Sequence, residues 1–189
     1  MASTGASSGR PKVLYVSCNH PAVRPGGLEL YAQDLYEGMR DGGELEPVML
    51  ARTGPPYSSI TREDTGKPFG LITRDPNQYF FYTDIRPDLS NYDALFGRTA
   101  NKDILTRAYR DFLLNHRPDL VHFHHTLFLG YDIVRTTRNV LPDVPIVYSL
   151  HEYVPICHRD GQMIRTKNDE LCEEESPRRC HECFPEISP

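Results

Sequence analysis

The sequence has little of the basic charge that nucleic-acid binding requires. Its 189 residues carry 21 Lys and Arg against 26 Asp and Glu, and the formal net charge is −5. No basic stripe follows any predicted element, so nucleic acid is not expected as a partner. The first predicted turn also lacks Gly-x-Gly-x-x-Gly, which argues against the alternative of a nicotinamide-dependent oxidoreductase.

Long apolar runs are absent as well. No run approaches the roughly 18 residues that a membrane-spanning helix needs. The first ten residues are mostly Ala, Ser, Thr and Gly and lack the apolar middle of a secretory signal, so residues 1–11 are predicted to form a disordered tail. We therefore expect a cytoplasmic protein, with any membrane contact peripheral and at the inner face.

Short apolar runs alternate with amphipathic segments along residues 12–153. Strands are predicted at 13–16, 48–50, 119–125 and 146–150, and helices at 28–39, 101–116 and 127–138. Between residues 53 and 90, prolines and glycines break the pattern, and the runs 69–73 and 79–82 predict a hairpin or edge strands. This alternation predicts an α/β fold: a Rossmann-like, doubly wound, mostly parallel sheet.

A glycine-rich turn, Pro25-Gly26-Gly27, joins the first strand to the first helix. Glycine lets the backbone approach a ligand closely, and a helix N-terminus attracts anions, so Gly26 and Gly27 are candidate ligand-binding residues for a phosphorylated group. The alternative is a plain tight turn. Glu29 would compete with an anion, so we expect it to orient the loop or contact a hydroxyl.

Histidines follow two of the predicted strands. His122, His124 and His125 end one strand and His151 ends another, and in a parallel sheet these ends share one rim with the glycine turn. His124 is the favoured ligand contact, whereas His122 suits a core histidine bonded to backbone. His151 and Glu152 suit an acid/base pair, with a plain loop carboxylate as the alternative for Glu152. The spacing argues against a zinc site made of these histidines.

Residues 154–189 form a cysteine-rich segment that is too poor in apolar residues to build its own core. Its cysteines are Cys157, Cys172, Cys180 and Cys183, of which the last two frame a Cys-x-x-Cys knuckle. A structural zinc ion with these four ligands would stabilise the segment. Two disulfides, an iron–sulfur cluster or unbound thiols are the alternatives, and His158 or His181 can replace one cysteine. Cys18 is predicted to be a small buried residue.

Several of these motifs resemble, in the same order, those of family 4 glycosyltransferases of GT-B architecture. The matching stretches are Pro25-Gly26-Gly27-Leu28-Glu29, Pro118-Asp119-Leu120-Val121-His122-Phe123-His124 and Tyr148-Ser149-Leu150-His151-Glu152-Tyr153. The cysteine-rich segment is similar to an insert found in a subset of that family. The resemblance covers residues 12 to about 184, and Glu152 stands where the family often has Asp.

The resemblance implies an N-terminal acceptor-side domain that works with a second, nucleotide-sugar-binding domain. The reaction would be a retaining, metal-independent sugar transfer to a hydroxyl of a glycan or lipid-linked acceptor. Gly27 would approach the donor diphosphate, His124 would contact the donor sugar, and His151 and Glu152 would line the acceptor side. Gly26 and Glu29 complete the glycine loop.

The donor motif of that second domain, Glu-x7-Glu, has no counterpart in the right context. The only pairs at this spacing are Glu29/Glu37 and Glu174/Glu182, which lie in the first helix and the cysteine-rich segment. The donor-binding domain is therefore expected in cis or in trans, and the chain alone is expected to be inactive. The alternative is a non-catalytic half-transferase that binds a glycan or docks onto a partner.

Overall fold

The computed structural model describes residues 9–55, 69–71, 75–83, 102–151, 153, 155–157, 161–174 and 178–183. Its strands are β1 (Lys12–Ser17), β2 (Glu46–Thr53), β3 (Phe69–Leu71), β4 (Gln78–Tyr82), β5 (Leu120–Phe123) and β6 (Ile146–Tyr148). Its helices are α1 (Gly27–Gly42), α4 (Lys102–His116), α5 (Asp132–Val140) and the short 3₁₀ helix η1 (Cys180–Cys183).

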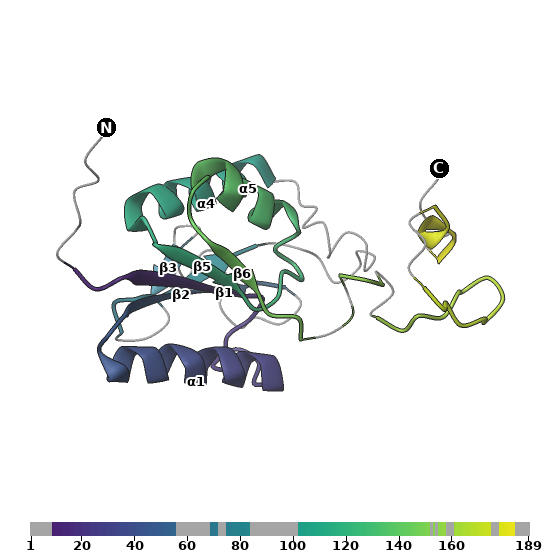
Figure 1. The fold of residues 1–189 in the computed structure, drawn as a ribbon, viewed down its shortest axis with the longest axis horizontal. Helices are drawn as coiled ribbons and strands as arrows, with labels where there is room; N and C mark the ends of the chain where they lie inside the picture. The colour runs from purple at the N-terminus through teal and green to yellow at the C-terminus, as the bar shows by residue number, and fades with distance from the viewer. Residues whose placement is uncertain are drawn as a thin grey trace.

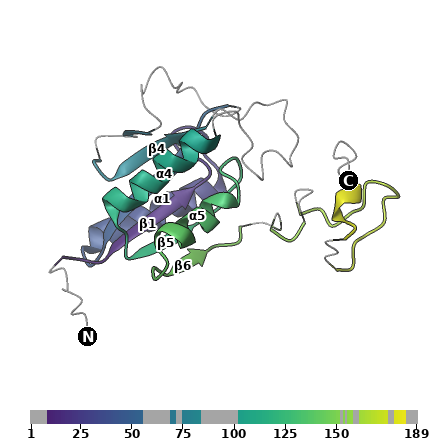
Figure 2. The same cartoon turned by 90° about the horizontal axis from the view of Figure 1, so that it is seen from above.

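The strands form one six-stranded sheet in the order β3-β4-β2-β1-β5-β6. Every neighbouring pair from β4 to β6 is parallel, and β3 alone runs antiparallel, along β4. Helix α1 covers one face of the sheet, while α4 and α5 lie on the other (Figures 1 and 2). The predicted Rossmann-like, doubly wound sheet is therefore confirmed.

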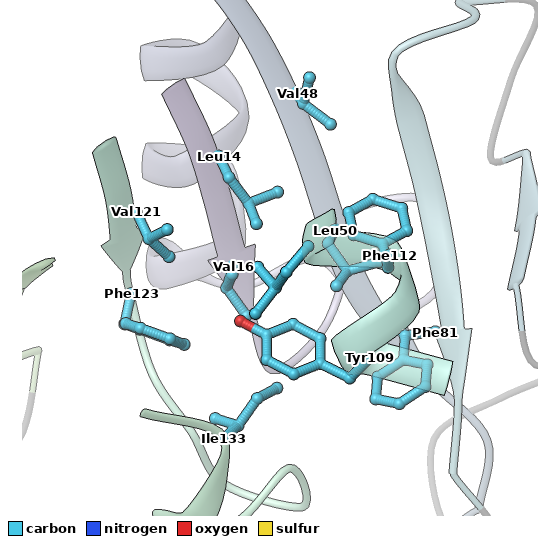
Figure 3. Packing of buried hydrophobic residues seen from close by; sticks show 11 residues of the cluster. Leu14, Val16, Val48, Leu50, Phe81, Tyr109, Phe112, Val121, Phe123 and Ile133 are labelled. Carbon is cyan, nitrogen blue, oxygen red and sulfur yellow. The ribbon is translucent and has the colours of Figure 1, made fainter. Parts of the chain in front are cut away.

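Each face of the sheet has its own apolar core because successive strand residues point to opposite sides. Leu14 and Val16 of β1 face α4 and α5, where they join the aromatic side chains of Tyr109, Phe112 and Phe123 (Figure 3). The alternate residues of β1 face α1; this second core consists of Val13, Tyr15, Ala32, Tyr36, Met49 and Ala51. Burial on both faces explains why these strands are continuous apolar runs in the sequence.

Helix α1 contains the whole of the predicted helix 28–39 and is longer at both ends. It ends at Gly42, and Gly43 adopts a left-handed backbone conformation (φ 71°) in which its N–H bonds to the carbonyl of Arg40. At the other end Gly26 is extended, and among the described residues no side chain caps the first turn. The N–H groups of this turn are therefore left for other partners.

Helix α5 and the predicted hairpin differ most from the prediction, while β5 and β6 end two residues earlier than predicted and β2 is longer at both ends. Helix α5 starts at Asp132 rather than Leu127, because Phe128 (φ 62°) and Gly130 (φ 83°) take left-handed conformations that a helix does not allow. The predicted hairpin is present as β3 and β4, but β4 also pairs in parallel with β2. It is therefore an interior strand, and its Phe80 and Phe81 are buried in the core.

A fully buried arginine, Arg52, joins three loops at the carboxyl edge of the sheet. Its Nε donates to Thr83 Oγ1 (2.7 Å), and its Nη2 donates to the carbonyls of Thr83 (3.1 Å) and Pro55. Its guanidinium also lies over the ring of Phe128, 4.9 Å from the ring centre. The planar, five-donor group of arginine makes these contacts at once.

Of the predicted tail, residues 1–8 lie outside the described residues, and Arg10 donates to the carbonyl of Gly43 (3.1 Å). Near the C-terminus, a short bridge pairs Ile164 with Leu171. The proposed division after residue 153 stays a prediction. Within the described part of the chain, none of the helices has the length and apolar character to cross a membrane.

The core packing predicts how strongly single truncations destabilise the fold. We expect Phe123→Ala, at a fully buried ring, to lower the free energy of unfolding by about 3–5 kcal/mol, because it opens a cavity. Leu114→Ala, at a side chain that is 43% exposed on α4, should cost no more than about 0.5 kcal/mol. Urea unfolding of the two variants measures both values, and equal losses would contradict the assigned core.

Candidate functional site

The predicted site residues gather where the order of the parallel strands reverses. From β1 the chain proceeds to β2 on one side, whereas β5 pairs with β1 on the other. The N–H of His124, just past β5, donates to the carbonyl of Val16 in β1 (2.9 Å). In open α/β sheets the crevice outside the strand ends at such a reversal is the usual ligand site.

The structure brings His124 and His151 together, although 27 residues separate them in the sequence. His124 Nδ1 lies 3.4 Å from His151 Nε2. Tyr31 of α1 packs edge-on against both rings, with centroid distances of 5.7 Å to His124 and 5.5 Å to His151. On the α1 side of the sheet, Tyr31 therefore connects the first helix to the histidines that follow β5 and β6.

His122 and His124 share one face of the sheet, as their spacing predicts. Their ring centroids lie 4.2 Å apart, and Tyr15 of β1 contacts both rings. His122 is half-buried, and its Nε2 bonds to Ser149 Oγ (2.8 Å), so its hydrogen-bond partner is a side-chain hydroxyl rather than the expected backbone group. Ser149 itself follows β6 and was not predicted as a site residue.

His124 and His125 are neutral at neutral pH because burial in the protein removes the water that would stabilise a charged ring. Burial, together with the neighbouring His122 and His151, lowers the pKa of His124 to about 3. Burial and His151 lower the pKa of His125 to about 4, against the opposing effect of Glu29. His124 is fully buried, and its Nε2 has no hydrogen-bond partner among the described residues. Because the ring has no exposed surface in this structure, the predicted ligand contact of His124 stays a prediction.

Of the predicted acid/base pair, His151 and Glu152, only His151 lies among the described residues. His151 is exposed at the rim, where its ring can meet a solvent-borne ligand. Glu152 lies outside the described residues, so the pairing of these two side chains stays a prediction.

The two glycines of the loop differ in what surrounds them. A methyl group built on Gly26 would lie 2.5 Å from Glu29 Oε2, so this glycine makes room for the carboxylate. A methyl group on Gly27 would meet no described atom within 4 Å. Packing within the described chain therefore explains the first glycine, whereas an added methyl group at Gly27 would meet open space, as it would at Gly38 and Gly42 of the same helix.

Glu29 makes contacts within the loop, in agreement with the expectation that it orients the loop. It is buried and accepts a hydrogen bond from Asn19 Nδ2 (3.4 Å), with Cys18 Sγ at 4.0 Å. Cys18 is buried, as predicted. Sequence reasoning missed Asn19 and the adjacent His20. The signal that marks them is a run of polar residues directly after a buried strand, at the edge where ligands bind.

The four cysteines of the C-terminal segment are half-buried, and within the described part of the chain none of them forms a disulfide. Cys180 and Cys183 lie in one turn, η1, but no group of three or more Cys, His, Asp or Glu among the described residues is placed to hold a metal ion. Two nearby arginines that could offset thiolate charge pair with carboxylates: Arg165 with Glu170 at 3.7 Å and Arg179 with Glu182 at 3.9 Å. His158 and the side chain of His181 lie outside the described residues, and zinc stays a prediction.

Comparison with known proteins adds no relative to this picture. No protein-family model matches the chain, and a search of curated proteins finds no match either. The function is therefore inferred from the rim, where an uncapped helix start, a glycine with open space and neutral histidines meet.

The buried histidines predict a loss of stability in mild acid. The unfolded chain takes up protons near pH 6.5, whereas folded His124 and His125 do so only at about 3 and 4. Stabilisation that is present above pH 6.5 is therefore lost as the pH falls toward 4, by ~1.4 kcal/mol for each unit of pKa lowering. Urea unfolding between pH 7 and pH 5 should show this decline. An equally steep decline in His124→Gln would contradict the assignment to this ring.

Elemental analysis tests the predicted zinc site. Protein purified under reducing conditions should contain about one zinc per chain, and Cys180→Ser or Cys183→Ser should abolish it, because a tetrahedral site needs four ligands. Cys18→Ala, which removes the one cysteine outside the segment, should leave the zinc content unchanged. A metal-free, fully reduced wild-type chain would contradict the prediction.

Proposed function

We propose that this chain is the N-terminal, acceptor-side domain of a GT-B glycosyltransferase, which transfers a sugar from a nucleotide-sugar to a hydroxyl. The observation that supports it most is the open space at Gly27, beside the uncapped start of α1 and at the reversal of the strand order. The motif resemblance of the glycine loop, β5 and the end of β6 supports the same proposal.

The start of α1 suits the diphosphate of the donor. The first-turn N–H groups and the positive end of the helix dipole attract anionic oxygens and stabilise the charge that develops on a leaving diphosphate. Without a Cβ at Gly27, the backbone can come close to such a group. Glu29 is turned toward Asn19 and Cys18, so its carboxylate is engaged within the loop.

The histidines suit the uncharged part of the reactants. The neutral His124 adds no charge to the site, and because its ring is fully buried, a sugar hydroxyl would have to displace a neighbouring side chain to bond to it. The exposed His151 lies next to it, and with Glu152 it is the proposed acid/base pair on the acceptor side. The acceptor is a glycan or a lipid-linked sugar, and the proposed location is the cytoplasm or the inner face of the membrane.

The second domain supplies most of the donor site in this proposal, in cis or in trans. A half-transferase that only binds a glycan or a partner is the second candidate. Exposed apolar side chains near the rim favour it: Tyr31 is 50%, Leu150 65% and Tyr153 66% exposed. Aromatic faces of this kind suit the apolar faces of sugar rings as well as a protein partner.

The decisive variant is Gly27→Ala in a protein that contains the donor-binding domain. Transfer of labelled sugar from uridine and guanosine diphosphate sugars to soluble and lipid-linked acceptors is measured. We expect Gly27→Ala to lower kcat/KM at least ~10-fold, equivalent to ~1.4 kcal/mol, because the new methyl keeps the diphosphate from the backbone.

The matched control is Gly38→Ala, in the same helix and equally open to an added methyl group. It should leave transfer unchanged and stabilise the helix by up to ~1 kcal/mol. Equal activity of both variants would contradict a ligand role for Gly27. Glycan binding with no transfer by any combination of domains would favour the second candidate.

A further inference from the structure

His20 forms the centre of the turn that leads from β1 to α1. The residue is buried, with 4% of its surface exposed. Its ring Nδ1 accepts a hydrogen bond from the N–H of Ala22 (3.0 Å). Its carbonyl oxygen accepts from the N–H groups of Val23 (2.9 Å) and Arg24 (3.0 Å). The turn before the glycines is thus built around this one residue.

The other ring nitrogen ties the turn to two distant elements. His20 Nε2 lies 3.1 Å from Gln33 Oε1 in α1 and 3.0 Å from Gln78 Oε1 in β4. Each glutamine amide has its orientation fixed by a carboxylate, because Gln33 Nε2 donates to Glu37 (2.6 Å) and Gln78 Nε2 lies 3.5 Å from Asp75 Oδ2. Both amide oxygens therefore face the histidine ring.

These partners determine the protonation state of the ring. A backbone N–H can only donate, so Nδ1 must carry a lone pair, and amide oxygens can only accept, so Nε2 must carry the proton. Burial lowers the pKa of His20, although the two glutamines and Glu37 act in the opposite direction. The ring is therefore neutral at neutral pH, and a second proton on Nδ1 would set two donors against each other.

We propose that His20 is a positioning residue: its neutral ring, protonated on Nε2, holds the β1–α1 turn against α1 and β4 and so fixes where Gly26 and Gly27 stand. No ligand contact is assigned to it. Its effect on the turn follows from the hydrogen bonds alone, whereas its effect on substrate binding rests on the proposed function.

Two substitutions separate the two ends of the ring. In His20→Asn the side-chain oxygen can still accept from the N–H two residues ahead, as in an Asx turn, but it cannot reach the glutamines. In His20→Gln the longer amide reaches Gln33 and Gln78 and loses the acceptor for Ala22. The control is His116→Gln, at a half-buried histidine that packs on Phe112, away from this turn.

The readouts are the ring tautomer and amide hydrogen exchange, both measured by NMR on the whole chain. We expect the proton of His20 on Nε2 at neutral pH. His20→Gln should speed exchange of the Ala22 amide by about 2- to 10-fold, the range for one lost hydrogen bond. His20→Asn and His116→Gln should leave that rate near the wild-type value.

A ring proton on Nδ1, or an Ala22 amide that exchanges equally fast in His20→Gln and His116→Gln, would overturn the proposal. The tautomer of the wild-type ring decides the matter even where a variant fails to fold. In a protein that transfers sugar, His20→Gln should raise KM more than it lowers kcat. Absence of any transfer counts against the proposed function alone, because the tautomer and the exchange rates need no substrate.

Discussion

The structure depends on the parallel pairing of β1 with a strand on each of its sides. β2 follows β1 through α1, while β5 arrives on the opposite flank after the chain has passed through β4 and α4. This arrangement buries β1 on both faces and places its carboxyl end beside that of β5. The glycine turn, the histidines after β5 and the start of α1 meet there because the strand order requires it, not because they are close in sequence.

Desolvation then sets the chemical character of the rim. Burial lowers the pKa of His122 and of His124, whose rings lie side by side, and the charge that His122 would carry lowers the pKa of His124 further. In the proposed transferase, the groups that attract an anion are therefore the N–H groups of α1 rather than the histidines. The backbone would recognise the phosphate of the donor, and the histidine rings would recognise hydroxyls.

Sequence reasoning reached those features that depend on local pattern. The position of α1 follows from its apolar spacing, and the shared face of His122 and His124 follows from strand alternation. The late start of α5 could not be predicted from the sequence, because Phe128 takes a left-handed conformation that no residue preference indicates.

The hydrogen-bond partners of the histidine side chains could not be predicted from the sequence either. His20 meets Gln78, which lies 58 residues further along the chain, and His122 meets Ser149 after another strand. Such contacts depend on the register of the finished sheet, which one sequence does not specify. The rim could thus be located from sequence, while the side chains that hold its loop in place could not.

The buried Arg52 has a consequence for how this rim can be altered. One guanidinium contacts Pro55, Thr83 and Phe128, which belong to segments that leave three different strands. Because all three segments contact the same side chain, a graft that replaces one of them must preserve its contact with Arg52. In the proposed transferase, substrate preference would therefore change by exchanging these three loops together, rather than one at a time.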